Sequence, residues 1–135
     1  TALLGDRLDR HRVHCLGRLP YDQYLAVLQV SAAHVHLTYP YAMSWSLLEA
    51  MACGAVVVGS ANAPVDEVIR QGENGLLVPF AAHDQLSRTL LRALRDPDAH
   101  APLGEAARRT VEQRYGLLTA VQAYEQLAES LRLVR

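Results

Sequence analysis

The sequence predicts an α/β fold with a parallel sheet of about four strands, flanked by helices and followed by a helical carboxyl-terminal tail. Short apolar runs alternate with helical patterns between residues 13 and 78, which is typical of βαβ units. The run at residues 55–59 (AVVVG) is continuously apolar, as a strand covered on both faces should be. From residue 83 onward, only helical patterns remain.

The strands are short apolar runs, each ended by a loop, a glycine or a proline. Gly17 closes the first run, and the second leads into a loop that contains Pro40. The third run ends in a polar turn, and the fourth stops at Pro79. The predicted strands are residues 13–16, 34–38, 55–59 and 76–78.

The helices follow from start and stop signals and from apolar stripes. Pro20 opens the first helix and Gly54 ends the second. In the tail, leucines recur at helical spacing, and Asp96-Pro97 reads as a turn that breaks the pattern. The predicted helices are residues 21–32, 44–53, 64–70, 83–95, 102–115 and 117–133.

Length, charge and cysteine content limit the function classes. A chain of 135 residues fits one domain, residues 1–135, that can bury its own core. Thirteen basic and fourteen acidic residues give a net charge of −1 without a dense basic stripe, which argues against nucleic-acid binding. Cys15 and Cys53 are too few for a disulfide framework, and nothing reads as a signal peptide. We expect a cytoplasmic protein, with peripheral association at the inner face of the membrane left open.

Two further features of the chain bear on its context. It opens on Thr1 rather than on methionine, inside a helical pattern at residues 2–10, so we expect a fragment, a processed product or a cloned piece. Residues 23–48 contain no Asp, Glu, Lys or Arg, which raises the question of a membrane span. Pro40 and several polar residues interrupt that stretch, and a buried passage of helix, strand and loop explains it better.

Ligands of open parallel sheets bind outside the carboxyl ends of the strands. The loop after Thr38 leads to Ser44, Trp45 and Ser46 at the start of a helix, where free backbone N–H groups favour an anion. One turn further on, Glu49 could accept hydrogen bonds from a sugar or ribose diol. This pattern indicates a phosphate-plus-diol site, and hence a nucleotide.

Several blocks of the sequence, in order, resemble the donor-site core of retaining glycosyltransferases with the GT-B fold (family 4). They are residues 46–60 (SLLEAMACGAVVVGS), residues 67–78 (EVIRQGENGLLV) and residues 13–20 upstream. The resemblance implies a Rossmann-like carboxyl-terminal lobe, truncated at its amino end and therefore incomplete. It also implies a nucleotide-sugar donor, no metal or other cofactor, and an acceptor-binding amino-terminal lobe that this chain lacks.

The resemblance assigns site residues, with one departure. The family has two glutamates eight positions apart around a glycine-containing loop; the later one falls on Glu49, which would bind the ribose. The earlier one, which contacts the transferred sugar, falls on Tyr41, and this is the position that we assign to catalysis. The residues expected to bind the donor are Glu49, Ser44, Ala42, Met43, Trp45, Ser46 and Leu19.

Other residues have competing interpretations. His34 and His36 share one face of a strand, but no third metal ligand has a persuasive spacing, so we favour ordinary structural histidines. Cys53 reads as a packing residue rather than a reactive thiol. Trp45 suits stacking on a ligand and core packing equally well. Glu67 is better explained as an acidic residue at a helix start than as a catalytic carboxylate.

The leading hypothesis is the donor-binding part of a glycosyltransferase that transfers a sugar with retention and is inactive as an isolated chain. The alternative is a non-catalytic interaction or carbohydrate-assembly module that has lost the chemistry, which Tyr41 in place of a glutamate supports. A related enzyme such as an epimerase would lack the spaced blocks.

Truncation raises a further expectation. The family's lobe has strand order 3-2-1-4-5-6, and the strands predicted here correspond to the third through sixth. The sheet would then have an open edge. Residues 13–16 could pair directly with residues 34–38, or the edge could recruit a second copy, and we favour self-association.

Overall fold

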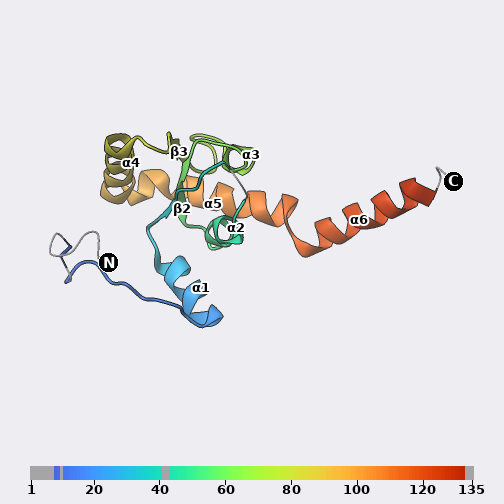
Figure 1. The fold of residues 1–135 in the computed structure, drawn as a ribbon, viewed down its shortest axis with the longest axis horizontal. Helices are drawn as coiled ribbons and strands as arrows, with labels where there is room; N and C mark the ends of the chain where they lie inside the picture. Colours follow the sequence, from blue (N-terminus) through green and yellow to red (C-terminus); the bar gives the residue numbers. More distant parts are fainter. Residues whose placement is uncertain (1–7, 10, 41–42, 133–135) are drawn as a thin grey trace.

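The computed structural model describes residues 8, 9, 11–40 and 43–132, and it confirms the α/β fold (Figure 1). Within that part of the chain, three parallel strands form one sheet in the order β1-β2-β3. Ala33 pairs with Val56 and His36 with Gly59, and on the other side of the central strand Ser60 pairs with Val78. The strands are β1 (Ala33–His36), β2 (Val56–Ser60) and β3 (Leu76–Val78).

Six helices lie in the described residues, two of them at the ends of the fold. α1 precedes the sheet, and α6 extends away from it with none of its residues buried (Figure 1). Because α6 stands free, the apolar stripe predicted for it is exposed to solvent. The helices are α1 (Tyr21–Val30), α2 (Trp45–Ala52), α3 (Val65–Val68), α4 (His83–Arg95), α5 (Pro97–Arg114) and α6 (Leu117–Arg132).

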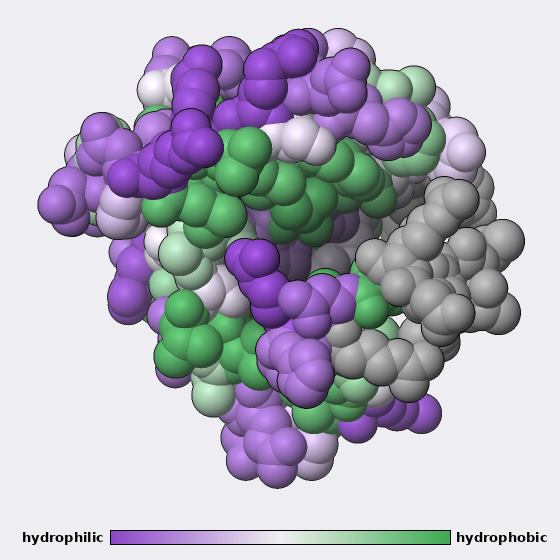
Figure 2. Space-filling model, turned by 90° about the vertical axis from the view of Figure 1, so that its left-hand side faces the viewer, coloured by the Kyte–Doolittle hydropathy of each residue, from purple (hydrophilic) through white to green (hydrophobic). Residues whose placement is uncertain are grey.

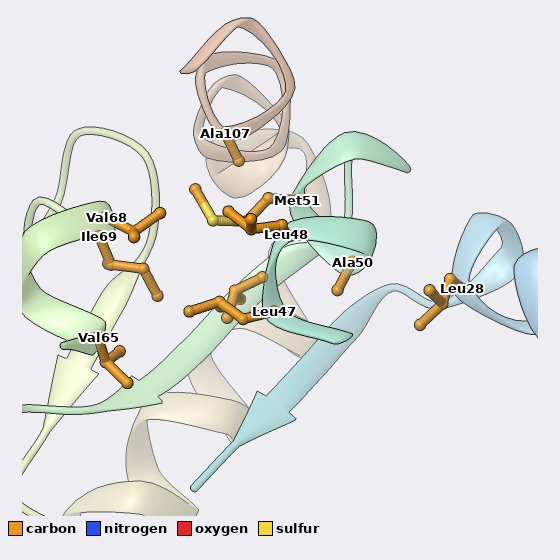
Figure 3. Close-up of a cluster of buried hydrophobic side chains, with 10 residues drawn as sticks. Leu28, Leu47, Leu48, Ala50, Met51, Val65, Val68, Ile69 and Ala107 are labelled. Carbon is orange, nitrogen blue, oxygen red and sulfur yellow. The ribbon is translucent and has the colours of Figure 1, made fainter. Parts of the chain in front are cut away.

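Both faces of β2 are covered, as its continuous apolar run predicts. On one face, Val57 packs with side chains of α2, α3 and α5 in the larger core cluster (Figure 3). On the other face, Val56 and Val58 pack with β3 and with Ala93 of α4. The alternation of side chains along a strand therefore divides one apolar run between two clusters. Hydrophobic residues also reach the surface on the face of the molecule that Figure 2 shows.

The strand predicted at residues 13–16 does not form, so this prediction was wrong. Among the described residues no strand pairs with this segment, and Val13 and Leu16 are 44% and 54% exposed. A strand is stable only when a neighbour pairs with its backbone. The direct crossover from residues 13–16 to β1 is consequently absent. β1 pairs on one side with β2 and is an edge of the described sheet.

The start of α5 also differs from the prediction. The helix begins at Pro97 rather than at residue 102, because the Asp96 carboxylate accepts a hydrogen bond from the Ala99 N–H at 3.1 Å. Proline suits the first helical position, where its missing N–H costs nothing. Asp96-Pro97 is thus both the end of α4 and the cap of α5. The helix predicted at residues 2–10 falls almost wholly outside the described residues.

Candidate functional site

The loop after β1 is held by hydrogen bonds of Thr38 where it leaves the carboxyl end of the sheet. The Thr38 N–H donates to Ser60 Oγ at 3.1 Å, and Ser60 Oγ lies at the same distance from the Thr38 carbonyl. That carbonyl also accepts a hydrogen bond from Asn62 Nδ2 at 2.7 Å. Ser60 is fully buried, so these contacts join the ends of β1 and β2. They hold the chain where it leaves the sheet toward α2.

The start of α2 lies where the sequence predicts it, and Ser44 caps it. Ser44 Oγ accepts a hydrogen bond from the Ser46 N–H at 3.3 Å, and the hydroxyl oxygens of the two serines are 2.7 Å apart. The cap satisfies one of the backbone donors that every helix leaves free at its amino terminus. Trp45 is 78% exposed at this end, so of its two interpretations core packing is excluded.

Glu49 lies in the middle of α2, on the same helix and the same side of the sheet as Ser44. Its carboxylate points to α1 and accepts two hydrogen bonds. Tyr21 Oη donates to Oε1 at 3.2 Å, and Tyr24 Oη donates to Oε2 at 3.0 Å. Burial, together with the hydrogen bond to Glu49, raises the pKa of Tyr24 to about 12. The pKa of Tyr21 is raised by desolvation and by the charge of Glu49.

Glu49 lines a pocket of about 240 Å³ between α1, α2 and the end of α5. Most of the wall is aromatic or aliphatic, so the carboxylate is the charged group in an otherwise apolar hollow. The lining residues are Tyr21, Trp45, Leu48, Glu49, Ala52, Val111 and Tyr115.

A second pocket, of about 210 Å³, adjoins the first and shares Trp45, Leu48 and Tyr115 with it. Met43 and Arg114 complete much of its wall, and the Arg114 guanidinium lies 5.4 Å from the centre of the Tyr115 ring. The two pockets form one aromatic hollow with a carboxylate at one end and a guanidinium at the other.

The structure brings together part of the predicted set. Met43, Trp45 and Glu49 line these two pockets, with Ser44 and Ser46 at the adjoining helix start. Leu19 is not among the lining residues. Tyr41 and Ala42 lie outside the described residues.

Sequence reasoning missed four residues, Tyr21, Tyr24, Arg114 and Tyr115. The two tyrosines of α1 are three positions apart, which places them on one helix face. That spacing was the only signal for the pair, because their partner Glu49 is 25 or more positions away.

The two histidines of β1 lie close to each other in the sheet. Their rings are stacked with centroids 6.5 Å apart, and burial lowers the pKa of both. His36 is 8% exposed, and its Nε2 has no hydrogen-bond partner among the described residues. Nowhere in the described part of the chain do three His, Cys, Asp or Glu side chains gather as a metal site would require.

Cys53 and Glu67 follow their structural interpretations. Cys53 packs against the larger core cluster, and burial raises the pKa of its thiol, which disfavours a reactive thiolate. Glu67 is an exposed residue in the first turn of α3. Among the described helices, none combines the length and the hydrophobicity that crossing a bilayer requires.

Comparison with known proteins gives consistent matches. The model of the family Glycosyl transferases group 1 matches residues 3–110. An uncharacterized glycosyltransferase of Methanocaldococcus jannaschii is 25% identical over 130 residues, which are 96% of this chain and 33% of that protein. N-acetyl-alpha-D-glucosaminyl L-malate synthase of Bacillus anthracis is 30% identical over 114 residues, 84% of this chain and 29% of that enzyme. The chain spans about a third of the length of these relatives.

Solved structures are similar across nearly the whole chain. Sucrose-phosphate synthase from Thermosynechococcus elongatus superimposes with a TM-score of 0.87 and 27% identity, over 99% of this chain and 34% of that one. HepE of Anabaena in complex with UDP gives a TM-score of 0.78 and 26% identity, over 91% of this chain and 33% of that one.

Proposed function

The chain belongs to the glycosyl transferases group 1 family, and on that basis we propose that it is the donor-binding part of an enzyme that transfers a sugar with retention. The donor would be a nucleotide-sugar, the acceptor would be held by another part of the protein, and no metal would be required. The similar HepE structure, solved with UDP, supports a nucleoside diphosphate as the recognised group.

The observation that carries this proposal is the environment of Glu49. Its carboxylate lies in a pocket with aromatic and aliphatic walls and already accepts two hydroxyl hydrogen bonds. A carboxylate with two oxygens can accept from both hydroxyls of a ribose at once. Trp45 offers an exposed ring beside it, on which a planar base or a sugar can stack.

The diphosphate would lie at the start of α2. A helix amino terminus carries a partial positive charge and free N–H donors, which together favour a phosphate. Ser44 and Ser46 add two hydroxyls there. In this proposal Met43 and Ala42 border the phosphates, Leu19 borders the nucleoside, and Tyr41 contacts the transferred sugar in place of a glutamate.

The proposed reaction needs no protein nucleophile. An oxygen of the departing diphosphate takes the proton of the acceptor hydroxyl as that hydroxyl oxygen bonds to the anomeric carbon on the same face. The protein would contribute by positioning the donor and by stabilising the charge that develops on the diphosphate. The acceptor and much of the diphosphate would be held by residues in other parts of the protein, including the basic residues around the diphosphate. The 135-residue chain alone should therefore not transfer sugar.

Calorimetric titration of the full-length protein with UDP, GDP and ADP, and with their sugars, tests the proposal. We expect one nucleotide series to bind, and nuclear magnetic resonance of the product to show the anomeric configuration of the donor. Failure of all three series to bind would contradict the proposal, and an inverted product would contradict retention.

The second hypothesis is a non-catalytic GT-B-like module. Tyr41 supports it, because this residue brings no charge where a glutamate contacts the sugar in the family. In the full-length protein, such a module would either bind no nucleotide-sugar or bind one without transferring its sugar to an added acceptor.

A further inference from the structure

The two tyrosines that bind Glu49 differ in how they are held. Tyr24 is half-buried, and its ring packs against the larger core cluster. Tyr21 is 61% exposed and lines the pocket that contains Glu49, whereas Tyr24 is not among the lining residues. Their rings are tilted by 37° with centroids 6.2 Å apart. One hydrogen bond therefore comes from the core side of the carboxylate and the other from the pocket side.

This asymmetry matters for a carboxylate that must accept a diol. An ionised carboxylate is only an acceptor, and its two oxygens offer about four lone-pair positions. A ribose diol donates most favourably with one hydroxyl to each oxygen. The Tyr21 hydroxyl, at 3.2 Å from Oε1, takes one of these directions from inside the pocket. The Tyr24 hydroxyl, at 3.0 Å from Oε2, belongs to a side chain that is not among those lining the pocket.

We propose that these tyrosines act on donor binding in opposite directions: Tyr24 positions the Glu49 carboxylate for the ribose, and the Tyr21 hydroxyl is displaced by a ribose hydroxyl when the nucleotide binds. The inference rests on the proposed function and goes beyond it, because it assigns roles to two residues of α1. Tyr24 is a positioning residue and acts through Glu49. Tyr21 is a competitor for the same oxygen.

Displacement of Tyr21 should cost no more than the net value of one hydrogen bond. Its side chain is exposed enough for water to replace Glu49 as the partner of the hydroxyl. Before the nucleotide binds, the Tyr21 hydroxyl supplies a hydrogen bond to a carboxylate that would otherwise face an apolar wall. Tyr24 stays in place throughout, because its ring is packed in the core.

Tyrosine-to-phenylalanine variants of the full-length protein test the proposal, since each removes one hydroxyl and keeps the ring. The probes are whichever of UDP, GDP and ADP binds most tightly, and its 2′-deoxy form, both titrated by calorimetry. We expect Tyr24→Phe to weaken ribonucleotide binding by about two- to tenfold and to reduce the preference over the 2′-deoxy form. We expect Tyr21→Phe to strengthen ribonucleotide binding by about two- to tenfold. Tyr124→Phe, at an exposed position of α6, is the matched control and should change neither value.

A purely structural role of Tyr24 would weaken both probes equally, so the ratio of the two dissociation constants separates positioning from folding. Equal weakening of both probes by Tyr24→Phe, or unchanged or weaker binding by Tyr21→Phe, would overturn the proposal. If Tyr24→Phe does not fold, Tyr21→Phe decides alone. Glu49→Gln distinguishes a failure of the tyrosine roles from a failure of the proposed nucleotide site. If Glu49→Gln weakens binding while neither tyrosine variant changes it, only the tyrosine roles fail. If Glu49→Gln leaves affinity unchanged, the proposed site fails as well.

Discussion

Gly104 of α5 lies directly against the Gly54 carbonyl in the turn between α2 and β2. A Cβ atom at position 104 would stand 2.2 Å from Gly54 O and 3.1 Å from Gly54 C. Gly54 ends α2 with φ at +78°, and Ala55 then leads directly into β2. The close approach of two backbones thus fixes the helix that carries Glu49.

Gly104→Ala should therefore destabilise the protein, although alanine favours helices by about 1 kcal/mol over glycine. The clash is with backbone, which cannot rotate away, so we expect an overpacking cost of about 3 kcal/mol, at the upper end of the usual range, and a net loss of about 2 kcal/mol. Chemical denaturation measures the free energy of unfolding. Glu105→Ala, at the next and exposed position of α5, is the control and should change stability little. A Gly104→Ala protein as stable as the original would contradict the observed packing.

Ser44 should have separable effects on stability and on ligand binding. Ser44→Ala removes the cap of α2 and should cost about 0.5–2 kcal/mol in the free energy of unfolding. Ser44→Asp keeps a capping oxygen but adds a negative charge where the diphosphate is proposed to bind. We expect its stability to be retained, its nucleoside diphosphate binding to weaken, and its nucleoside binding to be unchanged. Equal binding of the diphosphate by Ser44→Asp would place the phosphates elsewhere.

The histidines of β1 predict a loss of stability in acid. Burial lowers the pKa of His36 and His34 in the folded protein, so the unfolded chain binds protons at a higher pH than the folded one. Stability should therefore fall as pH drops below the ordinary histidine pKa of about 6.5 and toward the lowered values. His36→Leu should flatten this dependence in denaturation curves between neutral and mildly acidic pH. His83→Gln, at an exposed position, should keep it, and an unchanged slope in His36→Leu would contradict this role.

The free edge of β1 predicts self-association of the 135-residue chain. In the described sheet, β1 pairs only with β2, and Val35 and Leu37 are 41% and 39% exposed. Unpaired, apolar strand edges attract further strands. Sedimentation at micromolar concentration should show dimers, and Val35→Lys should reduce them. Val30→Lys, at an 83% exposed position of α1, should leave them intact. A strict monomer would contradict this prediction.

Local signals were sufficient for much of the fold. α4 and β3 coincide with their predicted bounds, because Asp96-Pro97 and Pro79 end them in any context. The strand at residues 13–16 was predicted from an apolar run, but pairing depends on a neighbour that the run itself does not encode. Asp96 differs from the predicted turn residue in another way, because a local hydrogen bond from the Ala99 N–H makes it the cap of α5.

The sequence predicts only those parts of the candidate site that depend on residues near one another in the chain. The helix start near Ser44 and the position of Glu49 one turn further on follow from the residues around them. The contact of Glu49 with Tyr21 and Tyr24 joins two helices that are separated by β1 and a loop. Nothing in the spacing of the tyrosines fixes how α1 packs on α2, so the residues that bind the carboxylate emerged only from the structure.

The Glu49 carboxylate is the proposed acceptor of the hydrogen bonds from the ribose of a nucleotide. The direct test is the dissociation constant of the nucleoside diphosphate for Glu49→Ala in the full-length protein, with Glu67→Ala as the carboxylate control. Hydrogen bonds to a charged group contribute about 1.5–3 kcal/mol, so we expect Glu49→Ala to weaken binding by at least about tenfold. Glu67→Ala should bind as the original protein does. An unchanged dissociation constant for Glu49→Ala, in a protein that remains folded, would contradict the central claim.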